Sequence, residues 1–185
     1  MNRTLALSMT LALTLPTVLS AGEVAGVKMP DTVTVEGKTL KLNGVGLRTK
    51  MMFKVYVAGL FLENASRDAA AVISADEVKR IELSILRKLS GSQVAEAISE
   101  GFEKNSKAQL PALKARLDTL TGWIPDVDKG DSIVLTYVPG KGTIVSARAS
   151  EKGVIEGKDF SDALLAVWLG PNPVQGDLKA KLLGN

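Results

Sequence analysis

The side chains with the clearest capacity for binding chemistry are those of Arg48 and Tyr56. A guanidinium presents a planar fork of N–H donors that fits a carboxylate, and a phenol hydroxyl can add a further hydrogen bond. If Arg48 lies beneath a layer of helices, its charge requires an anionic partner, either an acidic side chain or a bound acidic ligand. The alternative is a solvated strand edge, on which Arg48 lies in water beside Lys50 and Lys54.

The spacing of Arg48 and Tyr56 sets a geometric condition on any shared site. Residues 45–62 alternate between apolar and mixed positions, which predicts one long strand with both side chains on the same face. A straight strand would separate the two residues by ~26 Å. They can therefore reach one small ligand only if the segment bends or bulges between them. Gly59 is expected to mark a bulge or a close backbone approach.

The composition removes several classes of chemistry. The 185 residues include no His and no Cys, which excludes Ser-His-Asp and Cys-His catalysis, disulfides, and zinc, haem or iron–sulfur sites built on these ligands. The net charge is only +3, from 23 basic and 20 acidic residues that are interspersed, so nothing indicates nucleic-acid binding. No metal and no other cofactor is expected.

Two short motifs imitate ligand loops and are interpreted as ordinary structure. Residues 44–46 resemble part of a Gly-rich dinucleotide loop, but the third Gly is absent and the segment continues into a strand. Residues 126–131 resemble the start of a calcium loop. Tyr137, however, occupies the twelfth position, where a bidentate carboxylate is needed, so a turn before a strand is expected instead.

Residues 1–21 have the features of a secretory signal peptide. A short segment with Arg3 precedes an apolar run over residues 5–15 and a small-residue exit that ends at Ala21. The apolar run is shorter than the ~20 residues that span a bilayer, and an uncleaved membrane anchor is the alternative. The sequence thus predicts a periplasmic or secreted protein without stable membrane insertion after cleavage, in which residues 22–185 form one domain.

The elements that must position Arg48 and Tyr56 follow from the periodicity of apolar residues. Period-two alternation predicts a hairpin that turns at Glu36-Gly37 and ends at Asn43-Gly44, followed by strands over residues 45–62, 79–86, 131–137, 142–148 and 153–156. Helical spacing, with a capping box at Ser90 and Gln93, predicts helices over residues 67–74, 91–104, 110–120, 160–169 and 174–182. Runs of strands and helices indicate an α+β fold with a large, mostly antiparallel sheet.

Five blocks of the chain, taken in order, resemble the chalcone isomerase-like family. They lie at residues 44–48, 54–63, 89–94, 154–165 and 168–170, and they extend over nearly all of residues 22–185. The resemblance implies the family's open-faced β-sandwich, in which a helical layer covers the large sheet and a ligand cleft lies between the two. The family contains chalcone isomerases, non-catalytic relatives and fatty-acid-binding members.

The comparison with active isomerases implies that only part of their site is kept. Arg48 matches their Arg in the Gly-x-Gly-x-Arg block. Their other polar positions, which are a Thr, a Tyr, an Asn and a later polar pair, fall at or near Tyr56, Val94, Gly101, Phe160 and Ser161. Adding a phenolate across an enone needs hydrogen-bond donors that stabilise an enolate, and most of these are replaced here. An isomerase acting on a chalcone-like or other enone is therefore the alternative function.

The fatty-acid-binding members resemble the chain more closely. They hold the ligand carboxylate with an Arg of the same block and a Tyr of the following strand, which Arg48 and Tyr56 match. Burial of an acyl chain, worth ~0.8 kcal/mol per CH₂, would involve further candidate residues, namely Met51, Met52, Val94, Phe102, Phe160 and Trp168. The favoured hypothesis is a non-catalytic, exported protein that binds a small amphipathic carboxylic acid, a fatty acid. A ligand-free structural or interaction module, in which Arg48 pairs with an internal carboxylate, is a further alternative.

Overall fold

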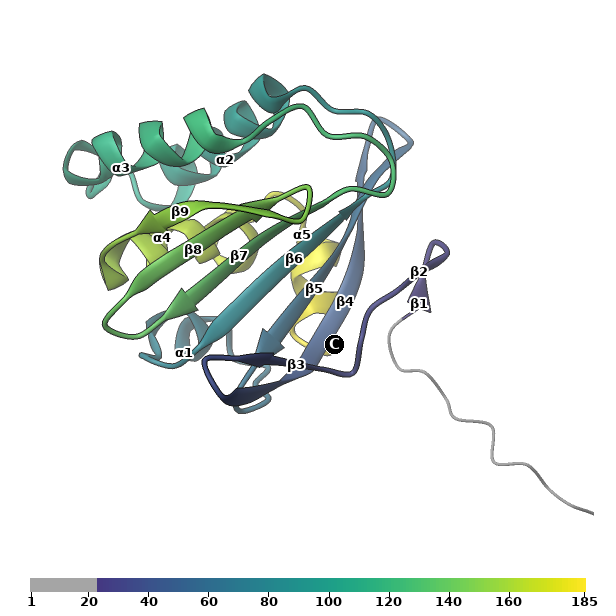
Figure 1. Ribbon diagram of the computed structural model, residues 1–185, viewed down its shortest axis with the longest axis horizontal. Helices are drawn as coiled ribbons and strands as arrows, with labels where there is room; N and C mark the ends of the chain where they lie inside the picture. The colour runs from purple at the N-terminus through teal and green to yellow at the C-terminus, as the bar shows by residue number, and fades with distance from the viewer. Residues whose placement is uncertain (1–22) are drawn as a thin grey trace, which may run out of the picture.

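A seven-stranded antiparallel sheet forms the centre of the molecule, which we describe from a computed structural model for residues 23–185 (Figure 1). Each strand pairs with its sequence neighbours in the order β3-β4-β5-β6-β7-β8-β9. The strands are β3 (Thr32–Val35), β4 (Lys38–Lys50), β5 (Phe53–Leu62), β6 (Lys79–Ile85), β7 (Ser132–Val138), β8 (Gly142–Ala147) and β9 (Ser150–Ile155). A separate small hairpin joins β1 (Glu23–Val24) to β2 (Val27–Lys28). The predicted signal peptide lies outside the described residues.

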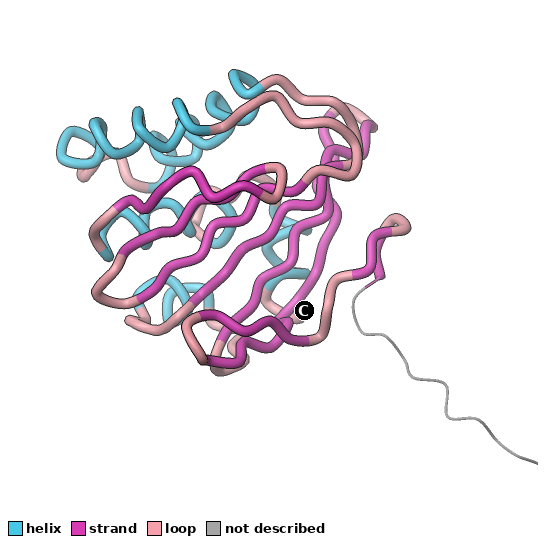
Figure 2. Tube along the Cα trace, viewed as in Figure 1, coloured by secondary structure: helices cyan, strands magenta, loops and turns pink. Residues whose placement is uncertain are grey.

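Helices cover one side of this sheet, with α4 and α5 behind it and α2 and α3 along its upper edge in Figures 1 and 2. They are α1 (Ala69–Ser74), α2 (Gly91–Asn105), α3 (Leu110–Trp123), α4 (Lys158–Leu169) and α5 (Gly176–Leu182). The predicted α+β architecture, a large antiparallel sheet under a helical layer, is confirmed. Among the described helices, none is both long and apolar enough to cross a membrane.

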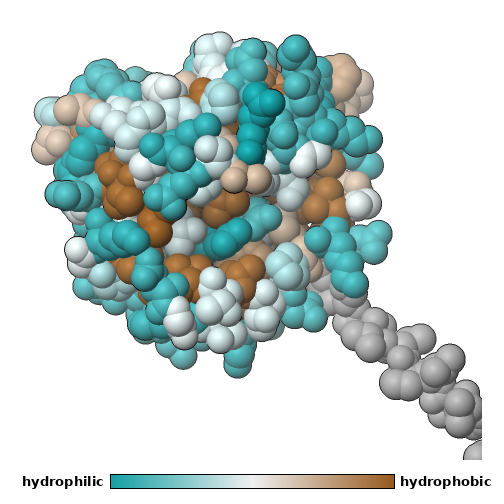
Figure 3. Space-filling model, in the orientation of Figure 1, coloured by the Kyte–Doolittle hydropathy of each residue, from teal (hydrophilic) through white to brown (hydrophobic). Residues whose placement is uncertain are grey.

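The sheet buries apolar side chains on both of its faces near β5. Ala58, Leu60 and Leu62 point toward the helices and join the main core, whereas Val57 and Phe61 join a second cluster on the opposite face. Successive residues of a strand point to opposite faces, which accounts for this division. The view in Figure 3 shows apolar side chains in separate patches, divided by hydrophilic ones.

The main difference from the sequence-based prediction is a tight hairpin within residues 45–62. The chain reverses at Met51 and Met52, whose φ angles of 49° and 67° match the type I′ turns of two-residue hairpins. Because such turns favour Asn and Gly, two Met residues gave no turn signal. A β-bulge then pairs Arg48 with Tyr56 and Thr49 with Lys54, which leaves Val55 as an extra residue. Across the two-residue turn, even-numbered residues of β4 share a face with odd-numbered residues of β5, as Lys50 and Phe53 do. The bulge restores the match of even with even, as in Arg48 and Tyr56. The apolar alternation along the sequence therefore continued unbroken through a reversal of the chain.

The structural roles of Asn43 and Gly59 differ in part from those that the sequence predicts. Asn43 does not end a strand but is the extra residue of a bulge inside β4, and its amide Nδ2 donates to the carbonyl oxygens of Ser66 at 2.9 Å and Leu182 at 2.8 Å. Gly59 is regularly paired with Val45 and marks a close approach, since an added Cβ would lie 3.3 Å from the Met29 sulfur. The capping box at Ser90 is confirmed, with both of its hydrogen bonds present.

A buried lysine joins three elements at the lower end of the sheet. Lys79 of β6 is 3% exposed, and its Nζ donates to the carbonyl oxygens of Val72 at 3.0 Å, Ile73 at 2.8 Å and Ala75 at 2.8 Å. Asp162 of α4 places a carboxylate oxygen 3.9 Å away. Burial lowers the pKa of Lys79 from 10.5 to about 8, against the opposing effect of Asp162. The lysine therefore holds the end of α1 on the sheet while its charge is partly compensated.

Replacing Lys79 by Met is expected to lower the free energy of unfolding at pH 7 by about 2 kcal/mol, because the three carbonyl oxygens lose their donor and Asp162 loses a nearby positive charge. Between pH 8 and 10.5 the unfolded wild-type chain holds a proton that the folded chain has released, so wild-type stability rises with pH in this window. The difference between wild type and variant should consequently grow from pH 8 to pH 10, as measured by urea unfolding. A constant difference over this range would contradict the lowered pKa.

Candidate functional site

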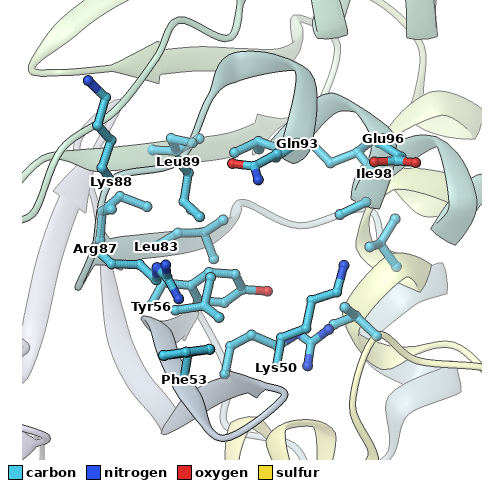
Figure 4. Close-up of a pocket in the computed structure, with 18 of the residues that line it drawn as sticks. Lys50, Phe53, Tyr56, Leu83, Arg87, Lys88, Leu89, Gln93, Glu96 and Ile98 are labelled. Atoms are coloured by element: carbon cyan, nitrogen blue, oxygen red, sulfur yellow. The ribbon is translucent and has the colours of Figure 1, made fainter.

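A cavity of about 350 Å³ opens between the β4–β5 hairpin, β6 and α2. Its volume lies within the ~300–1,000 Å³ typical of small-molecule sites. Figure 4 shows Tyr56, Leu83 and Phe53 on the sheet side, facing Gln93, Glu96 and Ile98 of α2. Most of the lining is apolar, comprising Val55, Leu83, Ile85, Leu89, Val94, Ala97, Ile98, Ile133, Val167, Trp168 and Val174.

Arg48 and Tyr56 both line this cavity and are direct partners across the β4–β5 ladder. Directly opposite residues of an antiparallel pair have Cβ atoms ~5 Å apart and point to the same face. The geometric condition set by the sequence is thus met by a chain reversal. Bulges re-aim side chains in this way and are frequent beside functional sites.

The Arg48 guanidinium is half-buried and is held by uncharged groups. Its Nη1 donates to the backbone oxygen of Thr49 and to Oε1 of Gln175 at 3.1 Å, and the same Oε1 accepts from the Thr49 amide at 2.9 Å. Within residues 23–185, no salt bridge involves Arg48. The pairing with an internal carboxylate is therefore absent among the described residues, and Arg48 is only partly exposed, whereas Lys50 and Lys54 are exposed. The fork of donors faces an apolar cavity without an anionic partner from the described chain.

The two glycines before Arg48 explain how Gln175 reaches the guanidinium. An added Cβ at Gly44 would lie 2.1 Å from the Lys181 carbonyl oxygen, and one at Gly46 would lie 2.8 Å from Leu178 Cδ1. Glycine at both positions thus lets α5 lie directly on β4. Gln175 is the N-cap residue of α5, so this close packing brings its amide to Arg48. The Gly-Val-Gly segment belongs to a strand, as expected, and serves packing rather than nucleotide binding.

Tyr56 presents a hydroxyl whose proton is available for a ligand. Its oxygen accepts a hydrogen bond from Trp168 Nε1 at 3.0 Å, and no described residue accepts the Tyr56 O–H in return. Burial raises the pKa of the Tyr56 phenol, although the hydrogen bond from Trp168 and the charge of Arg48 oppose this effect. The phenol therefore stays protonated at neutral pH and can act as a donor beside Arg48.

Charged side chains surround the cavity opening. Lys50, Arg87 and Lys88 line it together with Glu96, and all four are exposed. The guanidinium carbon of Arg87 lies 4.6 Å from the centre of the Phe53 ring, within the range of a cation–π interaction. Within residues 23–185, no group of three or more acidic side chains is arranged to hold a metal ion.

The residues predicted for the site from the sequence divide into two groups. Arg48, Met51, Tyr56, Val94 and Trp168 line the cavity. Met52, Phe102 and Phe160 do not. Met52 is 99% exposed at the hairpin turn, and the rings of Phe102 and Phe160 are fully buried in the core with their centres 5.5 Å apart.

Gln175 is the main site residue that sequence reasoning missed. It lies 127 residues after Arg48, in a loop segment that carries no recognisable motif. The only signal was indirect, because a glycine pair inside a strand indicates that another backbone approaches closely. The identity of that backbone could not be read from the glycines themselves.

Comparison with known proteins places this geometry in a family. The model of the chalcone isomerase-like family matches residues 21–184. The crystal structure of a fatty-acid binding protein from Arabidopsis thaliana superposes with a TM-score of 0.67 and 18% sequence identity, over 85% of this chain and 92% of that one. At this identity the likeness concerns the fold. A search of curated protein sequences found no match. From the match to its family model over nearly the whole length, this chain belongs to the chalcone isomerase-like family.

Proposed function

We propose that this protein binds a small amphipathic carboxylic acid, of the fatty-acid class, in the cavity between β4–β5 and α2. The observation that carries the proposal is the Arg48 guanidinium, which lies at an apolar cavity without a carboxylate partner from the described chain. Water solvates a half-buried guanidinium only in part, so an anionic ligand that accepts its hydrogen bonds would be favoured at this position.

The side chains around Arg48 define how such a ligand would lie. The carboxylate would accept hydrogen bonds from the guanidinium fork and from the Tyr56 hydroxyl, whose oxygen is held by Trp168. The hydrocarbon chain would then extend along the apolar wall formed by Leu83, Ile98 and their neighbours. Each buried CH₂ contributes ~0.8 kcal/mol, so affinity would increase with chain length until the cavity is filled.

The same geometry favours binding over isomerase chemistry. At the positions where active isomerases are expected to carry hydrogen-bonding groups, Val94 offers an apolar side chain and Phe160 lies in the core. Gly101 offers no side chain and packs against Val167. The related Arabidopsis thaliana structure is a fatty-acid binding protein, which supports the ligand class but not a particular acid. Export through residues 1–21 remains part of the proposal, so the ligand would be met outside the cytoplasm.

Calorimetric titration with laurate is expected to show one binding site with a dissociation constant in the micromolar range or below. Dodecanol, which has the same chain but no charge, should bind at least about tenfold more weakly, because a charge-assisted hydrogen bond is roughly twice as strong as a neutral one. Octanoate and palmitate test the dependence on chain length. Equal affinity for laurate and dodecanol, or no binding of any acid, would refute the proposal.

A further inference from the structure

In the part of the chain that the structure describes, the large apolar side chains that remain exposed are gathered at one place. Within residues 23–185, the large apolar residues that remain exposed are Met51 at 82%, Met52 at 99% and Phe53 at 60%. All three lie at the turn between β4 and β5, and we call residues 50–54 the hairpin tip. Exposed clusters of large apolar side chains on a soluble domain commonly mark a surface that binds a partner.

Neither packing in the core nor the conformation of the turn accounts for two Met residues at this tip. Both adopt positive φ, which is unfavourable for large side chains without a turn preference. The other two-residue turns with positive φ carry Ala25-Gly26, Glu36-Gly37 and Arg148-Ala149, none of which exposes a large apolar side chain. The tip thus combines unfavourable backbone φ angles with exposed apolar side chains. Such a combination indicates that these residues serve a function rather than the stability of the fold.

Basic side chains surround the apolar tip. Lys50 and Lys54 are the first and last residues of the tip and flank its three apolar residues, while Arg87 and Lys88 follow β6 alongside, and all four basic side chains are exposed. No salt bridge within residues 23–185 involves any of them. Apolar side chains among unpaired cations are complementary to an anionic bilayer, whose headgroups attract the charges while the interface accepts the apolar groups.

The tip also forms part of the cavity opening. Lys50, Met51 and Phe53 line the cavity together with Arg87 and Lys88. In Figure 4, Phe53 and Arg87 lie on the same side of the cavity as Tyr56, with Lys50 extending toward α2. A surface that bound this tip would therefore meet the opening through which an amphipathic acid enters.

We propose that the hairpin tip docks the protein on anionic lipid bilayers, with Met51, Met52 and Phe53 in the interface and the four basic side chains on the headgroups. The cavity then opens toward the lipid, so that an acyl ligand passes between bilayer and protein without crossing water. This ligand transfer rests on the proposed function, whereas the docking itself does not.

Sedimentation with vesicles tests the docking. The test uses residues 22–185, which contain the complete described core, so that the apolar N-terminal segment cannot itself bind lipid. We expect binding to vesicles of phosphatidylglycerol and phosphatidylcholine in equal parts, much weaker binding to phosphatidylcholine alone, and a loss of binding at high salt.

The double variant Met52→Asn with Lys54→Glu should bind at least about tenfold more weakly to the mixed vesicles than the wild type does. Asn suits the positive φ at position 52, and neither residue lines the cavity, so the fold should be kept.

The matched control is Lys107→Glu, which makes the same charge change at an exposed position in the connection between α2 and α3. It should bind vesicles nearly as the wild type does. Equal binding by wild type and double variant, or wild-type binding that does not distinguish the two vesicle types, would overturn the proposal. So would a dimer in light scattering that the double variant converts to a monomer, because a second copy would then be the partner.

Failure of docking and failure of ligand binding can be separated with the same proteins. Laurate titration without vesicles reports on the cavity alone. Intact laurate binding without vesicle binding would overturn the docking inference and leave the proposed function standing. Vesicle binding without laurate binding would support docking and refute the proposed function.

Discussion

Replacement of Arg48 by Met is expected to weaken laurate binding by about 100-fold or more. Removing one member of a desolvated, hydrogen-bonded charge pair costs ~2–5 kcal/mol, and each 1.4 kcal/mol corresponds to about a factor of ten in affinity. Met keeps much of the apolar stem, so the change removes the charge and the donors rather than the packing. Calorimetric titration of wild type and variant with laurate, and with dodecanol as the uncharged probe, measures the effect. Dodecanol affinity should change little.

Two further variants test whether the loss of laurate affinity depends on the position of the charge and on the planar shape of the guanidinium. Lys54→Met removes a positive charge from an exposed position of the same hairpin that does not line the cavity, and it should alter laurate affinity by less than about threefold, as expected for a solvated charge. Arg48→Lys keeps the charge without the planar fork and should lie between wild type and Arg48→Met. Laurate affinity in Arg48→Met within about threefold of wild type, with an unchanged unfolding transition, would show that Arg48 does not hold the carboxylate.

Substitution of Gly44 by Ala is expected to lower the free energy of unfolding by about 3 kcal/mol, at the upper end of overpacking effects. The new methyl group would meet the Lys181 carbonyl oxygen at 2.1 Å and the Leu182 carbonyl oxygen at 2.6 Å, and these backbone atoms cannot move without α5. Displacing α5 would also withdraw Gln175 from Arg48, so laurate affinity should fall as well. Urea unfolding and laurate titration of the same variant measure the two consequences.

Gly122→Ala provides the matched control, because an added methyl group at this position in α3 has open space around it. Glycine inside a helix is unfavourable by ~0.5–1 kcal/mol relative to alanine, so this variant should be slightly more stable than wild type. If Gly44→Ala were as stable as Gly122→Ala, the close packing of α5 on β4 would not be required for the fold.

The architecture could be predicted from the sequence to a large extent. Strong alternation in β6, the capping box at Ser90 and the apolar stripe of α4 each depend on neighbours within a few residues. Local patterns of this kind determine the element type because they record which face of each segment is buried. The reversal at Met51 and Met52 was missed, since the turn and the bulge at Val55 together left the alternation unbroken.

The candidate site was predicted only in part. Arg48, Tyr56 and Val94 line one cavity, whereas Phe102 and Phe160 lie in the core, because neither helical spacing nor a match to a family position distinguishes a core side chain from one that faces a cleft. Met52 was expected beside the ligand and instead extends from the turn. Its exposure follows from a chain reversal that no local signal indicated.

The amino-acid sequence by itself determined the class of fold, the absence of His and Cys chemistry, and the presence of one Arg and one Tyr with capacity to bind an acid. Only the tertiary structure decided that these two side chains lie opposite each other, that Gln175 rather than a carboxylate holds the guanidinium, and that the cavity opens beside an exposed apolar tip. The reason is physical. Burial patterns follow from neighbours along the chain, whereas a binding site depends on the register between strands and on contacts between segments that are distant in sequence.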